Sequence, residues 1–155
     1  MKTNADDAVQ DWIAQSQGRT YVSDWLTVDE SMISRFADVT QDWTFLHVDE
    51  DAARAVGLEG TIAHGFLSLS LLSVLRESAR TPELPGIAKG FNYGLDGVRF
   101  LEPVSSGARV RGHFSVAEIV GTGPGRYRQT LRVSVEIEGR ERPALVADWL
   151  IMAMT

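Results

Sequence analysis

The chain has 155 residues, of which 44% are hydrophobic and 23% charged, and its formal net charge is −6. This size and composition suit a single globular domain over residues 1–155, and the acidic balance argues against a nucleic-acid partner, which would need basic patches. Cysteine is absent, which excludes disulfides, thiolate metal sites and cysteine nucleophiles and suits the cytoplasm.

The first forty residues predict two helices separated by a short strand. Residues 1–19 are expected to form an N-terminal helical extension, because they show a weak amphipathic period and lack the apolar core of a signal peptide. A short strand is expected over residues 21–26. The segment Thr27-Val-Asp-Glu30 matches a capping box, so a second helix should begin there and end near Val39.

The middle of the chain contains the strongest helical pattern. Residues 40–48 have no regular period and are expected to be a loop, whereas Asp49 can cap a short helix that Gly57 ends. Residues 62–79 are apolar almost all round, which predicts a long helix buried in the middle of the domain. Its apolar run is too short to cross a bilayer, so no membrane association is expected.

The second half of the chain is typical of antiparallel strands. Alternating apolar and polar residues predict four strands, over residues 87–100, 108–120, 127–138 and 144–154, with a glycine-rich hairpin over 121–125. Early helices followed by hairpin-joined strands predict an α+β fold, in which an antiparallel sheet wraps around one long central apolar helix.

Two residues in the irregular segment can form an acid–base pair. Asp42 and His47 are five residues apart, a spacing that would separate them by about 140° on a helix but lets them converge in a loop. An aspartate beside a histidine fixes the imidazole tautomer and strengthens it as a base. In isolation, such a pair more often consists of a turn-capping aspartate and a surface histidine. A metal site built from Asp42, His47 and Asp49 would match no standard ligand spacing, so no metal is expected.

Gly65 lies where the expected buried helix begins. The first turn of a helix presents unpaired N–H groups, and a glycine leaves them open to a substrate oxygen, which would make an oxyanion hole. Taken alone, this glycine is better explained by close packing against the sheet. The hydroxyl of Ser73, further along the same helix, can bind substrate or bond back to the preceding turn.

Taken together, these motifs resemble the hydratase motif of the MaoC-like dehydratases, the (R)-specific enoyl-CoA hydratase group of the hot-dog fold. The family pattern runs approximately D-x-N-P-x-H-x-D, then A-x-x-x-G, then I-A-H-G-[MF]-L. This chain has Asp42-Trp-Thr-Phe-Leu-His47-Val-Asp49, then Ala53-Arg-Ala-Val-Gly57, then Ile62-Ala-His-Gly-Phe-Leu67. The sequence around the third motif is similar to that of the branch named after nodulation protein N.

The resemblance implies a role for five residues. Asp42 and His47 match the catalytic pair that handles water and the α-proton. Gly65 matches the residue whose backbone N–H binds the thioester oxygen. Ser73 matches a serine that helps to order the active site, and His64 matches a mainly structural histidine of the same substrate-binding motif.

The implied activity is that of a hydro-lyase of fatty acid metabolism, which adds water reversibly to a trans-2-enoyl thioester to give a 3-hydroxyacyl thioester. No cofactor is implied beyond the CoA or acyl-carrier arm of the substrate. Thr44 and Phe45 stand where the family commonly has Asn-Pro. Two alternatives stay open: a hot-dog acyl-CoA thioesterase, which the lack of a helix carboxylate before Glu77 disfavours, and a non-catalytic acyl-thioester-binding subunit.

A homodimer or higher homo-oligomer is the expected assembly, because one helix face and the strand over residues 93–100 would otherwise expose much apolar surface. In the resembled family, the two sheets of a dimer join edge to edge. A CoA substrate is polyanionic, so positive charge should gather at the mouth of the pocket. The nearest candidates in the sequence are Arg54, Arg76, Arg80 and Lys89.

Overall fold

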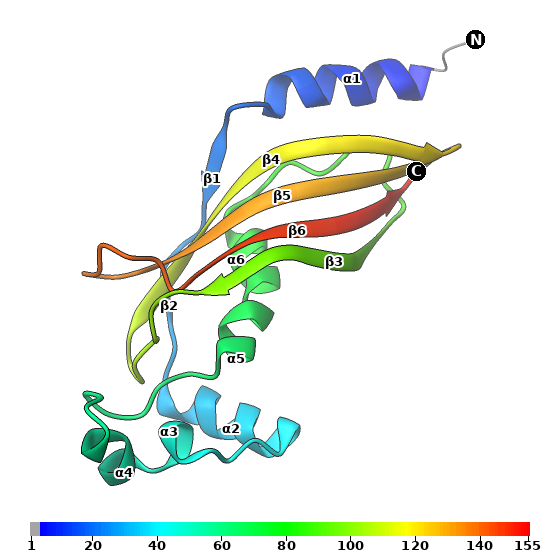
Figure 1. Ribbon diagram of the computed structural model, residues 1–155. Coiled ribbons are helices and arrows are strands. Elements are labelled where there is room, and N and C mark those ends of the chain that lie inside the picture. Colours follow the sequence, from blue (N-terminus) through cyan, green and yellow to red (C-terminus); the bar gives the residue numbers. More distant parts are fainter. Residues whose placement is uncertain (1–3) are drawn as a thin grey trace.

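One antiparallel sheet forms the main layer of the molecule, which the computed structural model describes over residues 4–155 (Figure 1). The strand order is β1-β4-β5-β6-β3, with β2 also pairing with β4. The strands are β1 (Thr20–Val22), β2 (Leu26–Thr27), β3 (Lys89–Phe100), β4 (Arg109–Gly123), β5 (Arg126–Ile137) and β6 (Leu145–Met154). The expected α+β fold is therefore confirmed.

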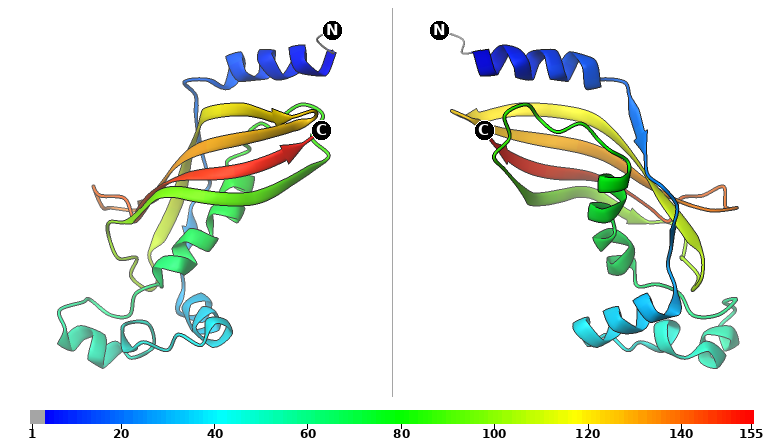
Figure 2. Two further views of the ribbon diagram at one scale, coloured as in Figure 1. Left: turned by 45° about the vertical axis from the view of Figure 1, so that its right-hand side comes forward. Right: turned by 180° about the vertical axis from the view of Figure 1, so that it is seen from behind.

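The inner face of the sheet packs against two short helices, α5 (Gly65–Ser70) and α6 (Leu72–Ser78). Figure 2 shows from two sides how the long strands pass across these helices. Because side chains alternate along a strand, one face of β5 is apolar and buried, as Leu131 and Val133 illustrate. These residues join Leu72 and Leu75 of the helices and Phe114 of β4 in one core.

The long helix expected over residues 62–79 is shorter and interrupted. It begins only at Gly65, because Ile62 bridges to Ser105 and the N–H of Ala63 donates to the carbonyl of Val104. An irregular turn at Leu71 (φ −69°, ψ −12°) separates α5 from α6. The expectation of burial all round was also wrong. One side of the helix pair faces away from the sheet, and the Phe66 side chain is 70% exposed.

Three further helices gather at one end of the molecule, away from the long strands (Figures 1 and 2). They are α2 (Glu30–Thr40), α3 (Phe45–Val48) and α4 (Glu50–Ala55). The residues expected to be a loop thus contain the short helix α3. Asp49 caps α4 as expected, since its side chain accepts a hydrogen bond from the N–H of Ala52, and Gly57 (φ +94°) follows the end of that helix.

The cap of α2 differs from the expected one. Asp29, not Thr27, caps the helix, and its Oδ1 accepts a hydrogen bond from the N–H of Met32 at 2.8 Å. Thr27 is instead held in β2, where it pairs with Arg109 of β4. The strand expected over residues 21–26 is accordingly two short strands joined by an irregular segment.

The opposite end of the molecule carries α1 (Asn4–Ser16), which lies beside β4 (Figure 1). Val9 and Trp12 of α1 are buried in the common core, so the expected N-terminal helix is an integral part of the domain. The hairpin between β4 and β5 is tighter than expected, because β4 continues as far as Gly123. No helix in the described part of the chain is long and apolar enough to cross a membrane.

Candidate active site

The turn after α2 positions Asp42. Gln41 ends the helix in the left-handed conformation (φ 59°), and Asp42 is the first residue beyond it. The Oδ1 atom of Asp42 accepts hydrogen bonds from the Thr44 hydroxyl at 2.7 Å and from the Thr44 N–H at 3.2 Å. These two bonds, the hydroxyl first, lower the pKa of the exposed Asp42 carboxyl below its ordinary value. Asp42 is therefore a carboxylate at neutral pH.

His47 lies on α3 with one ring nitrogen already engaged. Its Nδ1 is 2.7 Å from the carbonyl oxygen of Ile62. A carbonyl can only accept, so Nδ1 carries the proton, and Nε2 of the neutral ring is left as the acceptor. The N–H of Ile62 in turn donates to the carbonyl of Leu46. The chain before α5 thus holds the imidazole in one orientation and one tautomer.

His64 supports this arrangement from the protein interior. Its ring stacks on that of His47, with ring centroids 3.7 Å apart and planes 23° from parallel. Its Nε2 donates to the backbone carbonyl of Asp42 at 2.9 Å, whereas its buried Nδ1 has no hydrogen-bond partner among the described residues. His64 is only 3% exposed. It therefore ties the backbone of Asp42 to the ring of His47.

The three side chains form a compact cluster. One carboxylate oxygen of Asp42 and one ring nitrogen each of His47 and His64 lie within 4.8 Å of one another. Two stacked imidazoles cannot both point in-plane lone pairs at one ion at the usual zinc–nitrogen distance of about 2.0–2.1 Å. Asp49, the third ligand considered in the metal hypothesis, caps α4 instead. The arrangement is one that suits proton transfer among the three side chains.

Gly65 and His47 line the same cavity. This cavity has a volume of about 260 Å³, and its wall includes Phe100, Glu102 and Ala144. A Cβ atom on Gly65 would lie 3.1 Å from the Phe100 ring, so close packing is one reason for a glycine here. Since Gly65 opens α5, its N–H also has no partner within that helix. Asp42 is not among the residues that line the cavity.

Glu102 and Phe100 are site residues that the sequence analysis missed. Phe100 is the last residue of β3 and Glu102 follows that strand, about forty positions after the motif that contains His64. The contact depends on pairing between distant segments, because the N–H of Ala63 must bond to the carbonyl of Val104 to bring them together. No local pattern in the sequence marks this pairing.

Ser73 lies apart from this cluster. It is on α6, where it lines a different cavity together with Arg76 and Trp149. The structure therefore brings Asp42, His47 and His64 together and places Gly65 beside His47, but it does not join Ser73 to them.

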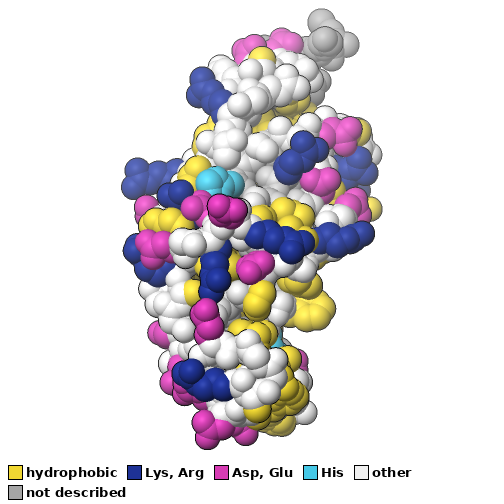
Figure 3. Space-filling view, turned by 60° about the vertical axis from the view of Figure 1, so that its left-hand side comes forward, with side chains coloured by type: hydrophobic (Ala, Val, Ile, Leu, Met, Phe, Trp, Pro, Cys, Tyr) yellow, Lys and Arg dark blue, Asp and Glu magenta, His cyan; other side chains and the backbone are white. Residues whose placement is uncertain are grey.

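The four cations expected at one pocket mouth are also separated. Arg54 lines a hollow beside His47 but pairs with Glu50 at 2.6 Å. Arg76 and Arg80 line the Ser73 cavity, and Lys89 begins β3. On the face shown in Figure 3, basic and acidic side chains intermingle, so that face carries no broad positive field.

Comparison with known proteins gives consistent similarities over nearly the whole chain. Residues 13–141 match the family model described as "MaoC like domain". The chain is 48% identical to Nodulation protein N of Rhizobium leguminosarum bv. viciae over 139 residues, which cover 89% of this chain and 84% of that protein. It is 37% identical to 3-hydroxyacyl-thioester dehydratase Z of Mycobacterium tuberculosis over 145 residues, which cover 94% of this chain and 95% of that protein.

A solved structure shows the same fold. The (R)-hydratase from A. caviae involved in PHA biosynthesis superimposes with a TM-score of 0.70, covering 87% of this chain and 94% of that one. At 24% sequence identity, the similarity establishes the hot-dog architecture of the sheet and its central helices.

Proposed function

Because this chain belongs to the family of MaoC-like domains, we propose that it adds water reversibly to a trans-2-enoyl thioester to give a 3-hydroxyacyl thioester. The observation that carries the proposal is the Asp42–His47–His64 cluster, next to the cavity that His47 and Gly65 share. The name of the mycobacterial relative, a 3-hydroxyacyl-thioester dehydratase, describes the same reaction in the reverse direction.

The proposed reaction needs one proton to be moved and no oxidant or reductant. A water oxygen bonds to C3 of the enoyl group while Asp42 and His47 remove one of the water protons. The electron pair of the C2–C3 double bond shifts towards the thioester carbonyl, and the Asp42–His47 pair returns a proton to C2. The ionised Asp42 carboxylate and the free Nε2 of His47 are both acceptors suited to the first step.

Negative charge builds up on the thioester oxygen during this reaction. A backbone N–H at the start of a helix stabilises such charge without a metal, because it is fixed in place before the reaction begins. Gly65 is the residue that we assign to this role, since it opens α5 and borders the cavity with His47. We propose accordingly that no cofactor takes part beyond the CoA or carrier arm of the substrate.

The test is hydration of crotonyl-CoA and longer trans-2-enoyl-CoA thioesters, followed by loss of the enoyl absorbance. Asp42→Asn and His47→Ala should each lower kcat/KM by about a hundredfold or more, as expected for loss of a general acid–base group. The matched controls are Asp51→Asn, on the exposed first turn of α4, and His113→Ala, whose ring pairs with Glu136 on the sheet. Both controls should retain activity.

Four outcomes would contradict the proposal. One is the absence of hydration across the whole chain-length panel by a folded protein. Release of free thiol from saturated acyl-CoA would instead indicate a thioesterase, and binding of the thioester without turnover would indicate a non-catalytic subunit. Activity untouched by both Asp42→Asn and His47→Ala would move the chemistry to other residues.

A further inference from the structure

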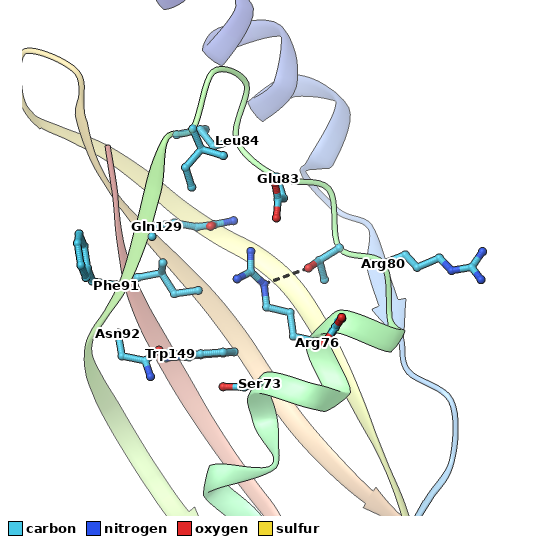
Figure 4. A pocket seen from close by; sticks show the side chains of 14 residues that line it. Ser73, Arg76, Arg80, Glu83, Leu84, Phe91, Asn92, Gln129 and Trp149 are labelled. Atoms are coloured by element: carbon cyan, nitrogen blue, oxygen red, sulfur yellow. Dashed lines mark hydrogen bonds between the residues drawn. The ribbon is translucent and has the colours of Figure 1, made fainter. Parts of the chain in front are cut away.

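A second cavity, of about 500 Å³, lies between α6, the loop that follows it and the inner face of the sheet (Figure 4). We call it the Arg76 pocket. Part of its wall is apolar, formed by residues that include Leu84, Ile87, Trp149 and Ile151, and the rest is polar or charged. Polar groups converge on the space that these walls enclose, which is the usual composition of a small-molecule site.

Gln129 is the most deeply placed of these polar groups. It is only 3% exposed, and it stands on β5 among residues of the buried core. Its amide points into the Arg76 pocket (Figure 4) and makes no hydrogen bond to any described residue. The amide is therefore available to a ligand in the pocket, which could bond to both its N–H and its carbonyl oxygen.

Arg76 brings a positive charge into the same space. Its Nε donates to the Thr81 hydroxyl at 3.0 Å, and its guanidinium lies over Trp149, 5.8 Å from the ring centroid. No carboxylate of the described chain lies within ion-pair distance of it. Loss of hydration consequently lowers the pKa of Arg76, and the more distant Glu83 offsets this only in part.

Further donors border the pocket beside Trp149. The Oδ1 atom of Asn92 accepts from the indole N–H of Trp149 at 3.1 Å, which leaves the amide nitrogen of Asn92 free to donate. The hydroxyl of Ser73 is directed to the same region (Figure 4). Glu77 and Glu83 line the pocket from α6 and the following loop, so an anion would be favoured on the sheet side, among the donors.

The pocket continues towards the candidate active site. A neighbouring hollow of about 310 Å³ shares Ser73, Asn92 and Trp149 with it and extends along the helices to Leu69. From Gly65 to Arg76 the helices rise about 16 Å at 1.5 Å per residue. The cavity at Gly65 shares no residue with these two hollows, so an acyl chain whose thioester lies at Gly65 must pass along α5 to bring its far end to Arg76.

We propose that the Arg76 pocket recognises a carboxylate group, held by the guanidinium of Arg76 together with the amides of Gln129 and Asn92. A carboxylate is planar and offers two acceptor oxygens, which match the paired donors of a guanidinium. It would also pair the partly buried charge that the protein itself leaves unpaired. Resting on the proposed function, the inference places this carboxylate at the far end of the acyl chain. The same chemistry would also admit a free carboxylic acid.

Calorimetric titration with saturated thioesters tests the inference independently of catalysis, because saturated acyl groups cannot be hydrated. The probes are sebacoyl-, dodecanedioyl- and tetradecanedioyl-CoA, whose acyl chains are long enough to approach the span from Gly65 to Arg76, each compared with the chain-matched decanoyl-, dodecanoyl- or tetradecanoyl-CoA. At least one dicarboxylic thioester should bind about tenfold tighter than its match, as for a charge-assisted hydrogen-bonded pair. Arg76→Met should abolish this preference.

The control is Arg35→Met, because Arg35 lies on α2, outside the residues that line the pocket, and its loss should leave the preference intact. Gln129→Leu removes the amide but leaves the charge of Arg76 and the side-chain volume unchanged. It should reduce the preference for dicarboxylic thioesters while the fold is retained. Equal binding of all matched pairs by the wild type, or a preference that survives Arg76→Met unchanged, would overturn the inference.

Two further comparisons are needed. One distinguishes a carboxylate on the acyl chain from a free carboxylic acid, and the other distinguishes failure of this inference from failure of the proposed function. Free dodecanedioate that binds as tightly as dodecanedioyl-CoA, with the same dependence on Arg76, supports the carboxylate site but assigns it to a separate acid. A preference for dicarboxylic thioesters in a protein that hydrates no enoyl-CoA supports the pocket and contradicts the hydratase proposal. Hydration of enoyl-CoA without a preference for dicarboxylic thioesters supports the hydratase proposal and contradicts the carboxylate site.

Discussion

At the scale of single residues, Thr44 explains how Asp42 is held. Thr44 stands where the resembled motif commonly has asparagine, yet its hydroxyl and its N–H both bond to the Asp42 carboxylate. This chain therefore orients the carboxylate with a hydroxyl. Since the hydroxyl is also the largest cause of the lowered pKa of Asp42, position and charge state depend on the same contact.

Replacing Thr44 by valine should raise the pKa of Asp42. The substitution keeps the side-chain shape but removes the hydroxyl that favours the ionised form, so the carboxyl should take up a proton at a higher pH than in the wild type. NMR titration of the Asp42 carboxyl carbon measures the change. Thr44→Ser keeps the hydroxyl and should titrate as the wild type does; a downward shift in the valine variant, or none, would refute this account.

The sequence predicted which side chains form the candidate site better than it predicted their orientation. Asp42, His47 and Gly65 follow from a motif, because their spacing is a property of the chain. The proton position on His47 depends on the carbonyl of Ile62, and the stacking on His64 depends on how α3 meets α5. These contacts join residues 15 or more positions apart, so no local pattern encodes them.

At the scale of elements, the strands were predictable and the helix ends were not. Period-two alternation is a local property, and all four long strands lie within a few residues of their expected positions. Both Thr27 and Asp29 are suitable N-cap residues. Because Thr27 pairs with β4 as part of β2, Asp29 caps α2. The start of α5 is likewise set by Ile62 and Ala63, which bond to the segment after β3 rather than continue a helix.

Gly112 on β4 is packed so closely that an added side chain should be poorly tolerated there. Its N–H donates to the hydroxyl of Ser23, which fastens the segment between β1 and β2 to the sheet. A Cβ atom here would lie 2.5 Å from the fully buried Phe114 ring and 3.2 Å from Leu75. Gly112→Ala should therefore lower the free energy of unfolding by about 1–3 kcal/mol, the usual cost of overpacking.

Urea denaturation measures this loss of stability. Gly121→Ala is the matched control, because it makes the same change on the same strand at a position with nothing within 4 Å of the added methyl group. Its effect should stay within about 0.5 kcal/mol. Equal stability of the two variants would show that Phe114 and Leu75 move aside easily.

At the scale of the whole molecule, apolar surface gathers around the free edge of the sheet. β3 is one of the edge strands and presents Phe91, Tyr93 and Phe100, while Phe66 of α5 lies beside Phe100. These four aromatic side chains are 49–70% exposed. Exposed apolar groups on a strand with unpaired backbone groups favour association with another chain. We propose that the partner is a second copy of this chain, paired edge to edge.

Light scattering coupled to size-exclusion chromatography should accordingly give the mass of a dimer. Tyr93→Lys places a charge in the middle of the edge and should shift the protein to monomer at micromolar concentration. Val39→Lys is the control, since Val39 is 84% exposed on α2, away from the edge, and should leave the dimer intact. A wild-type monomer would contradict edge pairing.

The position of β3 between β6 and solvent also bears on how the chain folds during synthesis. The candidate active-site residues and the helices α5 and α6 emerge from the ribosome before any of the long strands that cover them. The edge strand β3 must then wait for β6, the last element of the chain, before it has a partner. Since such long-range pairing is slow, the edge of the sheet and the part of the Arg76 pocket that β6 contributes form late. Loss of the C-terminal strand would thus leave both the sheet edge and the Arg76 pocket unformed.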